Sequence, residues 1–233
     1  MTLLTADLIS KLRELDTPTV CNALEIVVPE RRGYGFTTDS LKCLRPDLKP
    51  MIGFARTAKI RAKHPSDLSV ESNNKLLDDY YKYIDQGPKP SVVVIEDLDE
   101  ESGYGCFWGE VNSAIHMGLG CSGVITNGGV RDLADVAPGF QMLAGKVTPS
   151  HAFVHLVEFG EKVTVAGMDV GDGEILHADQ HGAVVLPNHS LGKIEHAAKL
   201  VAKREKVIID ATKRKDFDYK ILMMAKGNAS DIH

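Results

Sequence analysis

Apolar residues recur three or four positions apart in several segments, which is the spacing of one helix face. The first such segment, residues 5–26, predicts a helix that a Thr-Pro step interrupts. The same spacing predicts helices over residues 72–87 and 110–117 and a long helix over 191–213. Both ends of the chain are therefore expected to be helical.

Short apolar runs rich in β-branched residues alternate with these helices and predict buried strands. They occupy residues 51–62, 91–98, 122–129, 151–170 and 182–187. Because helices and strands alternate along the chain, we expect a layered α/β fold.

No internal repeat or linker divides the chain, so we expect one domain over residues 1–190. Residues 191–233 would form a C-terminal helical tail that packs on the same or on a neighbouring subunit. Within the domain, residues 130–137 predict a short helix that Pro138-Gly139 ends.

Composition narrows the class of protein. The 233 residues carry a net charge of -5, without the basic surplus of most nucleic-acid-binding proteins. No segment reaches the roughly 20 apolar residues that cross a membrane. The 4 cysteines include no C-x-x-C pair, which favours reduced thiols over a zinc site or a disulfide framework. We expect a cytoplasmic protein that binds neither nucleic acid nor membrane.

Gly118, Gly120 and Gly123 spell G-x-G-x-x-G, the nominal fingerprint of a dinucleotide-binding turn. That fingerprint requires a strand before the glycines and a helix after them, so that the pyrophosphate meets a helix N-terminus. Here the predicted helix 110–117 comes first and a strand follows. The phosphates would meet a helix C-terminus, whose dipole repels them. We interpret the run as a turn between helix and strand.

A second glycine pair, Gly128-Gly129, follows a predicted strand and precedes a predicted helix, so we expect a strand–turn–helix junction there, with Arg131 and Asp132 just past the turn. Ligands of α/β sheets gather at the carboxyl ends of strands. An arginine can hold a carboxylate with two parallel hydrogen bonds, and an aspartate offers hard oxygen to Mg²⁺ or Mn²⁺. Alternatively, the acid only complements a helix dipole and the arginine is solvated. The residue types alone leave both interpretations open.

The block from Trp108 to Asp135, "WGEVNSAIHMGLGCSGVITNGGVRDLAD", resembles the signature of the RraA-like family. That family includes the class II 4-hydroxy-4-methyl-2-oxoglutarate/4-carboxy-4-hydroxy-2-oxoadipate aldolases. Residues 16–25 and 173–187 also resemble family segments. The resemblance implies an αββα sandwich of the swivelling-domain type, with residues 1–190 as the RraA-like catalytic domain.

The resemblance implies a role for each matching residue. Arg131 would bind the pyruvate moiety of the substrate, and Asp132 would ligate Mg²⁺ or Mn²⁺ directly. Glu110 and Asp135 would contact the metal through water. With Arg131, the substrate-binding set would comprise backbone groups at the start of one helix, namely Gly109, Glu110, Val111 and Asn112. The catalytic set would be Arg131, Asp132 and Glu110.

The activity implied is a metal-dependent aldolase or lyase that cleaves a 4-hydroxy-2-oxo (di)acid to pyruvate, with oxaloacetate decarboxylation as a side activity. The partner would be a small 2-oxo acid, and the assembly a homotrimer or homohexamer. The alternative is a non-catalytic regulatory protein of the RraA type, which acts on a ribonuclease. In the family, an acid at the position of Asp135 accompanies aldolase activity, which favours the enzyme.

The chain also departs from the family pattern. It carries Asp172-Gly173-Glu174 and Gln180-His181-Gly182 where family members often have other residues. The roles of His151, His155, His177 and His181 stay open, and so does the choice between Glu195 and Glu205 as an acid supplied to a neighbouring subunit.

Overall fold

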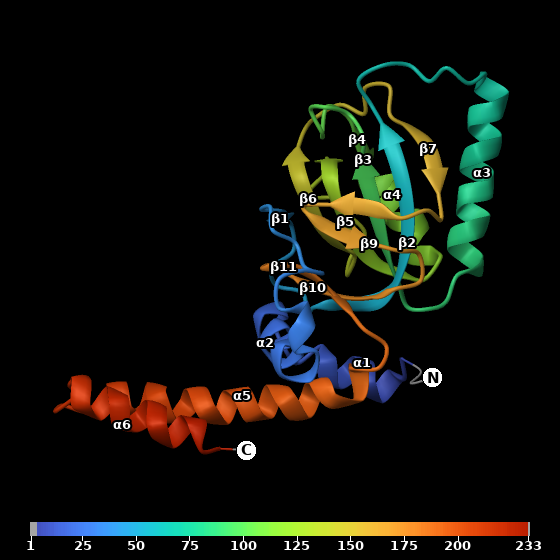
Figure 1. The fold of residues 1–233 in the computed structure, drawn as a ribbon. Coiled ribbons are helices and arrows are strands. Elements are labelled where there is room, and N and C mark those ends of the chain that lie inside the picture. The colour runs from blue at the N-terminus through green and yellow to red at the C-terminus, as the bar shows by residue number, and fades with distance from the viewer. Residues whose placement is uncertain (1–3, 233) are drawn as a thin grey trace.

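A strongly curved sheet forms the centre of the molecule (Figure 1). The structure is a computed structural model, and it describes residues 4–232. Within that range nine strands join the main sheet, and two more form a separate hairpin. The expected layered α/β class is confirmed, with a sheet that curves almost into a barrel.

The main sheet runs in the order β1 (Lys42–Cys43), β6 (Gln141–Val147), β5 (Cys121–Val130), β3 (Ser91–Asp97), β2 (Met51–Arg61), β10 (Ile175–Asp179) and β11 (Gly182–Leu186). Two short strands lie off this path: β4 (Cys106–Trp108) pairs with β5, and β7 (His155–Phe159) pairs with β2. The separate hairpin consists of β8 (Val163–Val165) and β9 (Met168–Val170).

The centre of the sheet is parallel. Strand β3 lies between β2 and β5, and β5 also pairs in parallel with β6 and with β4. The carboxyl ends of these strands therefore meet at one edge, where ligands of α/β sheets usually bind. The chain leaves β5 at this edge through Arg131 and Asp132.

Helices cover both the sheet and its lower end in Figure 1. Their bounds are α1 (Ala6–Leu12), α2 (Thr17–Val27), the 3-10 turn η1 (Pro29–Arg31), α3 (Val70–Gln86), α4 (Glu110–Gly118), α5 (Leu191–Thr212) and α6 (Tyr219–Ser230). The Thr17-Pro18 step begins α2, because the Asp16 carboxylate accepts the Thr19 N–H at 2.8 Å and proline suits the first turn of a helix.

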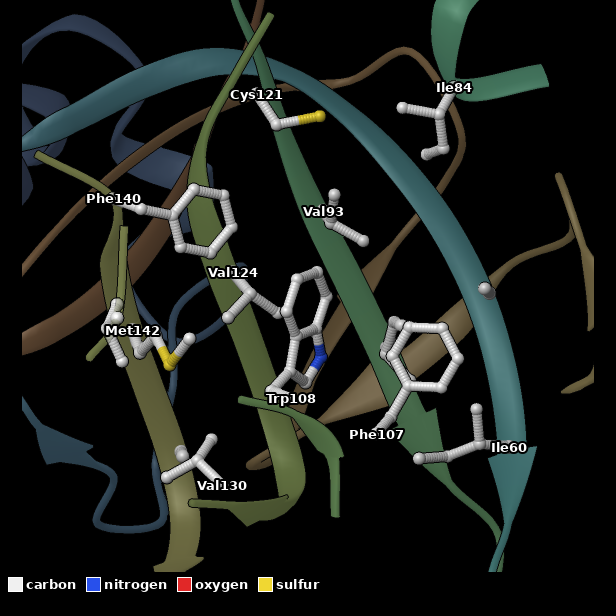
Figure 2. Packing of buried hydrophobic residues seen from close by; sticks show 14 of the residues in the cluster. Ile60, Ile84, Val93, Phe107, Trp108, Cys121, Val124, Val130, Phe140 and Met142 are labelled. Carbon is white, nitrogen blue, oxygen red and sulfur yellow. The ribbon is translucent and has the colours of Figure 1, made fainter. Parts of the chain in front are cut away.

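One apolar cluster lies against a face of strands β2, β3, β5 and β6, and Phe107 and Trp108 of β4 belong to it (Figure 2). Trp108 is fully buried, and its ring stacks on Phe140 with centroids 5.6 Å apart. Phe107 meets the Trp108 ring edge-on at 5.5 Å. The aromatic packing holds β4, and with it the start of α4, against β5.

The C-terminal helices form a hairpin that extends beyond the sheet (Figure 1). The buried side chains of α5 all lie in its first part, where it packs against α2. Farther along, α6 runs beside α5, and the Arg204 guanidinium of α5 donates to the Ile232 carbonyl at 2.8 and 2.9 Å. Of the two candidate acids on this segment, Glu195 forms ion pairs with Lys11 and Lys199 of its own chain. Among residues 4–232, no helix has both the length and the hydropathy of a membrane span.

The predicted short helix over residues 130–137 is wrong. Val130 still belongs to β5, and the residues after it form an irregular turn. Asp132 adopts a left-handed backbone conformation with φ 54°, which no α-helix accommodates. The Asp135 N–H closes the turn by donating to the Asp132 carbonyl at 2.9 Å.

Of the predictions for the two glycine segments, one is wrong and one is confirmed. Gly128 and Gly129 lie inside β5, so the expected strand–turn–helix junction is wrong. The interpretation of the earlier run is confirmed: α4 ends at Gly118, Gly120 has φ 85°, and β5 begins at Cys121. A dinucleotide fingerprint is excluded there, because the element order is helix, turn and strand.

Candidate functional site

Arg131 and Asp132 lie at the carboxyl end of β5. The Arg131 N–H donates to the Trp108 carbonyl at 3.0 Å, which extends the pairing between β5 and β4 by one residue. The next residue, Asp132, then leaves the strand in the left-handed conformation, which aspartate and asparagine adopt more readily than most residues. The two side chains are therefore presented at the edge of the sheet.

The Asp132 carboxylate lies over the N-terminus of α4. Its Oδ2 accepts the Glu110 N–H at 3.3 Å. The residue that precedes α4, Gly109, has no side chain to cap the helix, so an acid from another segment interacts with the first turn. A Cβ at Gly109 would collide with Asp132 Oδ2, so only glycine permits this close approach.

Ser113 connects the same two segments a second time. It is fully buried, its hydroxyl donates to the Glu110 carbonyl at 2.7 Å, and it accepts the Ala137 N–H at 3.0 Å. The turn that carries Arg131 and Asp132 is therefore joined to α4 at both of its ends.

Arg131 has a free guanidinium edge. Its Nε lies 3.4 Å from Asp132 Oδ2, and no acceptor among the described residues contacts its terminal nitrogens. The side chain is 36% exposed. Two parallel N–H groups are thus available for a ligand carboxylate.

An open hollow of about 370 Å³ lies beside this pair. It is lined by Arg131, Asp132, Leu133, Val147, Thr148 and Pro149. The last three follow or end β6, a strand that the sequence analysis did not predict. The short apolar run Met142–Ala144 was the sequence signal available for this strand. Because β6 pairs in parallel with β5, its carboxyl end lies beside that of β5, where ligands bind.

Thr148 is anchored from below by Cys106, whose Sγ lies 2.8 Å from the Thr148 Oγ1. Burial raises the pKa of the Cys106 thiol, although the hydrogen bonds to Thr148 oppose the shift. The thiol is therefore protonated at neutral pH and supports the floor of the hollow.

The two residues that follow Glu110 differ in what they can offer a ligand. Val111 is 68% exposed. The Asn112 side chain accepts the Tyr81 hydroxyl at 3.0 Å and donates to the Phe107 carbonyl, so it faces α3 and the core. The polar groups that these two residues can offer a ligand are therefore their backbone N–H groups, which helix N-termini commonly present to anions.

Asp132 and Asp135 do not share a helix face, because the helix predicted over residues 130–137 does not form. Asp135 is exposed in the turn, and neither it nor Glu110 lines the hollow. Glu110 begins α4 and Asp135 belongs to the turn after β5, and these are the two segments that the Asp132 carboxylate connects.

The side chains at the hollow limit which divalent cation could bind there. In residues 4–232, no group of three or more His, Cys, Asp or Glu side chains is placed so that it could hold a metal ion. Zinc sites usually require three or four such ligands, so the arrangement does not suit zinc. Mg²⁺ keeps several waters and binds through one or two carboxylates plus the ligand, which the exposed Asp132 carboxylate can supply. The residues present therefore fit Mg²⁺ or the chemically similar Mn²⁺.

The four histidines with open roles lie outside the hollow. His151 and His155 contact carbonyls of their own loop, at Ala152 and Phe153. His177 of β10 is buried against the first two helices, and burial lowers its pKa. Its Nε2 donates to the Leu12 and Leu15 carbonyls. His181 lies 3.1 Å from an Asp179 carboxylate oxygen.

The segment Asp172-Gly173-Glu174, which departs from the family pattern, is held by structural contacts. The Arg56 guanidinium donates to both Asp172 oxygens at 2.9 and 3.0 Å and stacks on the Tyr83 ring at 3.4 Å from its centroid. The Tyr83 hydroxyl also donates to Asp172. This departure therefore serves to fix the loop before β10.

A fifth histidine supports the site from within. His116 belongs to α4 and is fully buried. Its Nδ1 lies 2.6 Å from the Asn112 carbonyl, and its Nε2 lies 2.8 Å from the Tyr80 hydroxyl. Because a carbonyl only accepts, Nδ1 carries the proton and Nε2 accepts from Tyr80. Burial lowers the pKa of His116 to about 4.

Comparisons with known proteins agree with this architecture. RraAS2 of Streptomyces coelicolor, described as an unusual member of the RNase ES inhibitor RraA protein family, superimposes with a TM-score of 0.67 at 20% identity. The alignment covers 90% of this chain and 98% of that one. This likeness shows the fold and confirms the expected RraA-like architecture.

Two curated relatives match about half of this chain. Protein DlpA of Legionella pneumophila is 27% identical over 139 residues, which cover 54% of this chain and 21% of DlpA. An uncharacterized protein of Methanocaldococcus jannaschii is 30% identical over 122 residues, which cover 52% of this chain and 59% of that protein. This chain thus spans less than two thirds of either relative.

The family itself is identified by a model of the RraA-like proteins, described as Aldolase/RraA, which matches residues 17–185. The matched region contains α4, β5 and the turn with Arg131 and Asp132. On this match over most of its length, the chain belongs to the RraA-like family, which includes both aldolases and regulatory inhibitors.

Proposed function

We propose that this protein is a divalent-metal-dependent lyase that releases pyruvate from 4-hydroxy-2-oxo acids, with oxaloacetate decarboxylation as a side activity. One observation carries the proposal: a guanidinium with free terminal nitrogens and an exposed carboxylate lie side by side at a hollow, and the carboxylate also accepts the first N–H of a helix. Membership of the RraA-like family is compatible with lyase activity.

Arg131 would bind the substrate carboxylate through its two free N–H groups. This contact fixes one end of a 2-oxo acid, so that its carbonyl reaches the neighbouring Asp132. Holding the substrate in one orientation removes much of the entropic cost of reaction.

Asp132 would ligate Mg²⁺ or Mn²⁺, and Glu110 and Asp135 would act on the ion through water. When bound, the ion supplies a Lewis acid that polarises the C2 carbonyl of the substrate. Because the Glu110 N–H donates to Asp132, the Val111 and Asn112 N–H groups at the start of α4 would face the negative charge that develops on the substrate oxygens.

The proposed cleavage needs no reactant other than the substrate and a base. A base, supplied by solvent or a nearby carboxylate, takes the proton of the C4 hydroxyl. The electron pair of the broken O–H bond forms the C4=O double bond of the leaving aldehyde or ketone, and the C3–C4 bond breaks. Its electrons pass to C3 and the C2 oxygen as the enolate of pyruvate, which takes a proton at C3.

The experiment is a pyruvate-release assay on oxaloacetate and on a set of 4-hydroxy-2-oxo acids, with Mg²⁺ or Mn²⁺ and again with a chelator. We expect turnover that requires the metal. In Arg131→Lys, the loss of the two-pronged contact should raise the Michaelis constant about tenfold. Absence of metal-dependent turnover on every substrate would overturn the proposal.

The second candidate function is that of a non-catalytic regulator, because the family includes regulatory inhibitors. The same assay distinguishes the two functions, since a regulator would show no metal-dependent turnover.

For the assembly we propose a homotrimer or homohexamer with sites near subunit contacts. Light scattering coupled to size-exclusion chromatography measures the mass directly, and a monomer at micromolar concentration would contradict that assembly.

A further inference from the structure

The walls of the hollow beyond Arg131 are apolar. Leu133, Val147 and Pro149 form them, and Leu133 and Val147 remain 49% and 43% exposed. Apolar side chains gathered at the surface around a charged pair are typical of a contact with a ligand or partner. A ligand held by Arg131 would place its far end against these side chains.

Within the described residues, Arg131 is the one cation that lines the hollow. The nearest candidate along β6, Lys146, precedes Val147, and successive side chains of a strand point to opposite faces. The Lys146 chain lies against Gly103 instead, where an added Cβ would meet its Cδ at 2.9 Å. A second carboxylate on the ligand would therefore find no cation on the walls.

The surrounding acids reinforce this asymmetry. Glu110, Asp132 and Asp135 place three carboxylates on the two segments that form the site. Arg131 and a divalent ion together carry three positive charges, which these acids balance. The first carboxylate of a substrate already adds one negative charge, so a second one would be repelled.

We propose that the site accepts 4-hydroxy-2-oxo monocarboxylates whose group beyond C4 is an uncharged alkyl group, in preference to dicarboxylates. This inference rests on the proposed function and specifies its substrate class. The C1 carboxylate lies at Arg131, and the alkyl group lies against Leu133 and Val147. Cleavage of the C3–C4 bond then yields pyruvate and an alkyl aldehyde.

The first test compares two substrates of nearly equal shape. 4-Hydroxy-5-methyl-2-oxohexanoate carries an isopropyl group where 4-hydroxy-2-oxoglutarate carries a carboxylate. With Mg²⁺ or Mn²⁺ present, we expect kcat/KM for the monoacid to exceed that for the diacid at least about tenfold, the factor expected for one uncompensated charge or one missing apolar contact. An equal value, or a higher value for the diacid, overturns the inference.

The second test adds a cation to the wall. Val147→Lys should shift the ratio of the two kcat/KM values at least about tenfold toward the diacid. The matched control is Val157→Lys, a valine of β7 that is 39% exposed and does not line the hollow. A ratio that stays unchanged in a folded, active Val147→Lys protein also overturns the inference.

A third measurement separates this inference from the proposed function. Pyruvate itself has no group beyond C3, so metal-dependent exchange of its methyl protons in D₂O reports enolate formation alone. Exchange together with a preference for the diacid refutes only the substrate class. Absence of exchange and of turnover refutes the proposed function, and the inference with it.

Discussion

Asp132 Oδ2 accepts the backbone N–H of Glu110 at 3.3 Å, so a carboxylate from the turn after β5 closes the N-terminus of α4. The helix has no capping side chain of its own. The partial positive charge of a helix N-terminus attracts an acidic side chain at this position. The pair therefore couples the position of a candidate metal ligand to the position of the helix.

Asp132→Asn tests the carboxylate with little change to the backbone, because asparagine also tolerates the left-handed conformation. We expect metal-dependent pyruvate release to fall roughly 100-fold or more, as when a group that stabilises developing charge is removed. The control is Asp47→Asn, an exposed aspartate that pairs with Arg45 at 3.2 Å outside the site. Wild-type kinetics in Asp132→Asn would rule out the proposed role.

Gly109→Ala should lower turnover about 10- to 100-fold, because the new Cβ would displace the Asp132 carboxylate. Gly118→Ala, at the other end of the same helix, is the matched control: its Cβ would meet nothing within 4 Å. It should leave turnover unchanged and could raise stability by up to about 1 kcal/mol. Steady-state kinetics and thermal unfolding of both variants check this, and equal kinetics would refute the close-approach argument.

Ser113→Ala should lower kcat, because the buried Ala137 N–H loses its acceptor and the Glu110 carbonyl loses the hydroxyl that donates to it. Leaving buried polar groups unpaired should also lower the unfolding free energy by about 1–3 kcal/mol. Ser190→Ala provides the comparison: Ser190 is equally buried and donates to the Pro187 carbonyl at 2.7 Å, away from the site. If both variants lose the same stability but neither loses activity, Ser113 has no positioning role.

His116 should make the fold sensitive to mild acid. Its pKa is lowered by burial from 6.5 to about 4, so the unfolded chain binds a proton more readily in this range. The stability contributed by the neutral ring is complete above about pH 6.5 and falls as the pH drops toward 4. Between pH 7 and pH 5, wild type should lose about 2 kcal/mol more than His116→Gln.

Urea unfolding at the two pH values measures this difference. Some pH dependence should persist in the variant, since burial lowers the pKa of His177 as well. Identical losses in wild type and His116→Gln would show that His116 is not responsible.

The sequence predicted those parts of the fold whose signal is local. The apolar run 91–98 and the helix spacing of 110–117 were sufficient, because each pattern is complete within one element. Strand β6 was not predicted because Gly145 and Lys146 interrupt its apolar pattern. Val147, which ends this strand and lines the hollow, was therefore not recognised either. The strand is defined by its pairing with β5, which a local pattern does not show.

The sequence placed Arg131 and Asp132 together after a strand, but it did not predict their geometry. The pairing of Arg131 and Asp132 at the end of a strand followed from the sequence, whereas the left-handed turn at Asp132 depends on contacts with α4. The orientation of Asn112 likewise depends on Tyr81 of α3, thirty-one residues earlier in the chain. Such contacts between distant segments leave no periodic trace in a sequence.

The hairpin of α5 and α6 has a consequence for the dynamics of the molecule. The buried side chains of α5 end at Ala198, and beyond that point α5 and α6 pack mainly on each other (Figure 1). Helices with so little anchorage open in local fluctuations that cost much less free energy than global unfolding. Their amide hydrogens should exchange with solvent long before those of β3 and β5, so the chain combines a slowly exchanging sheet with a labile arm.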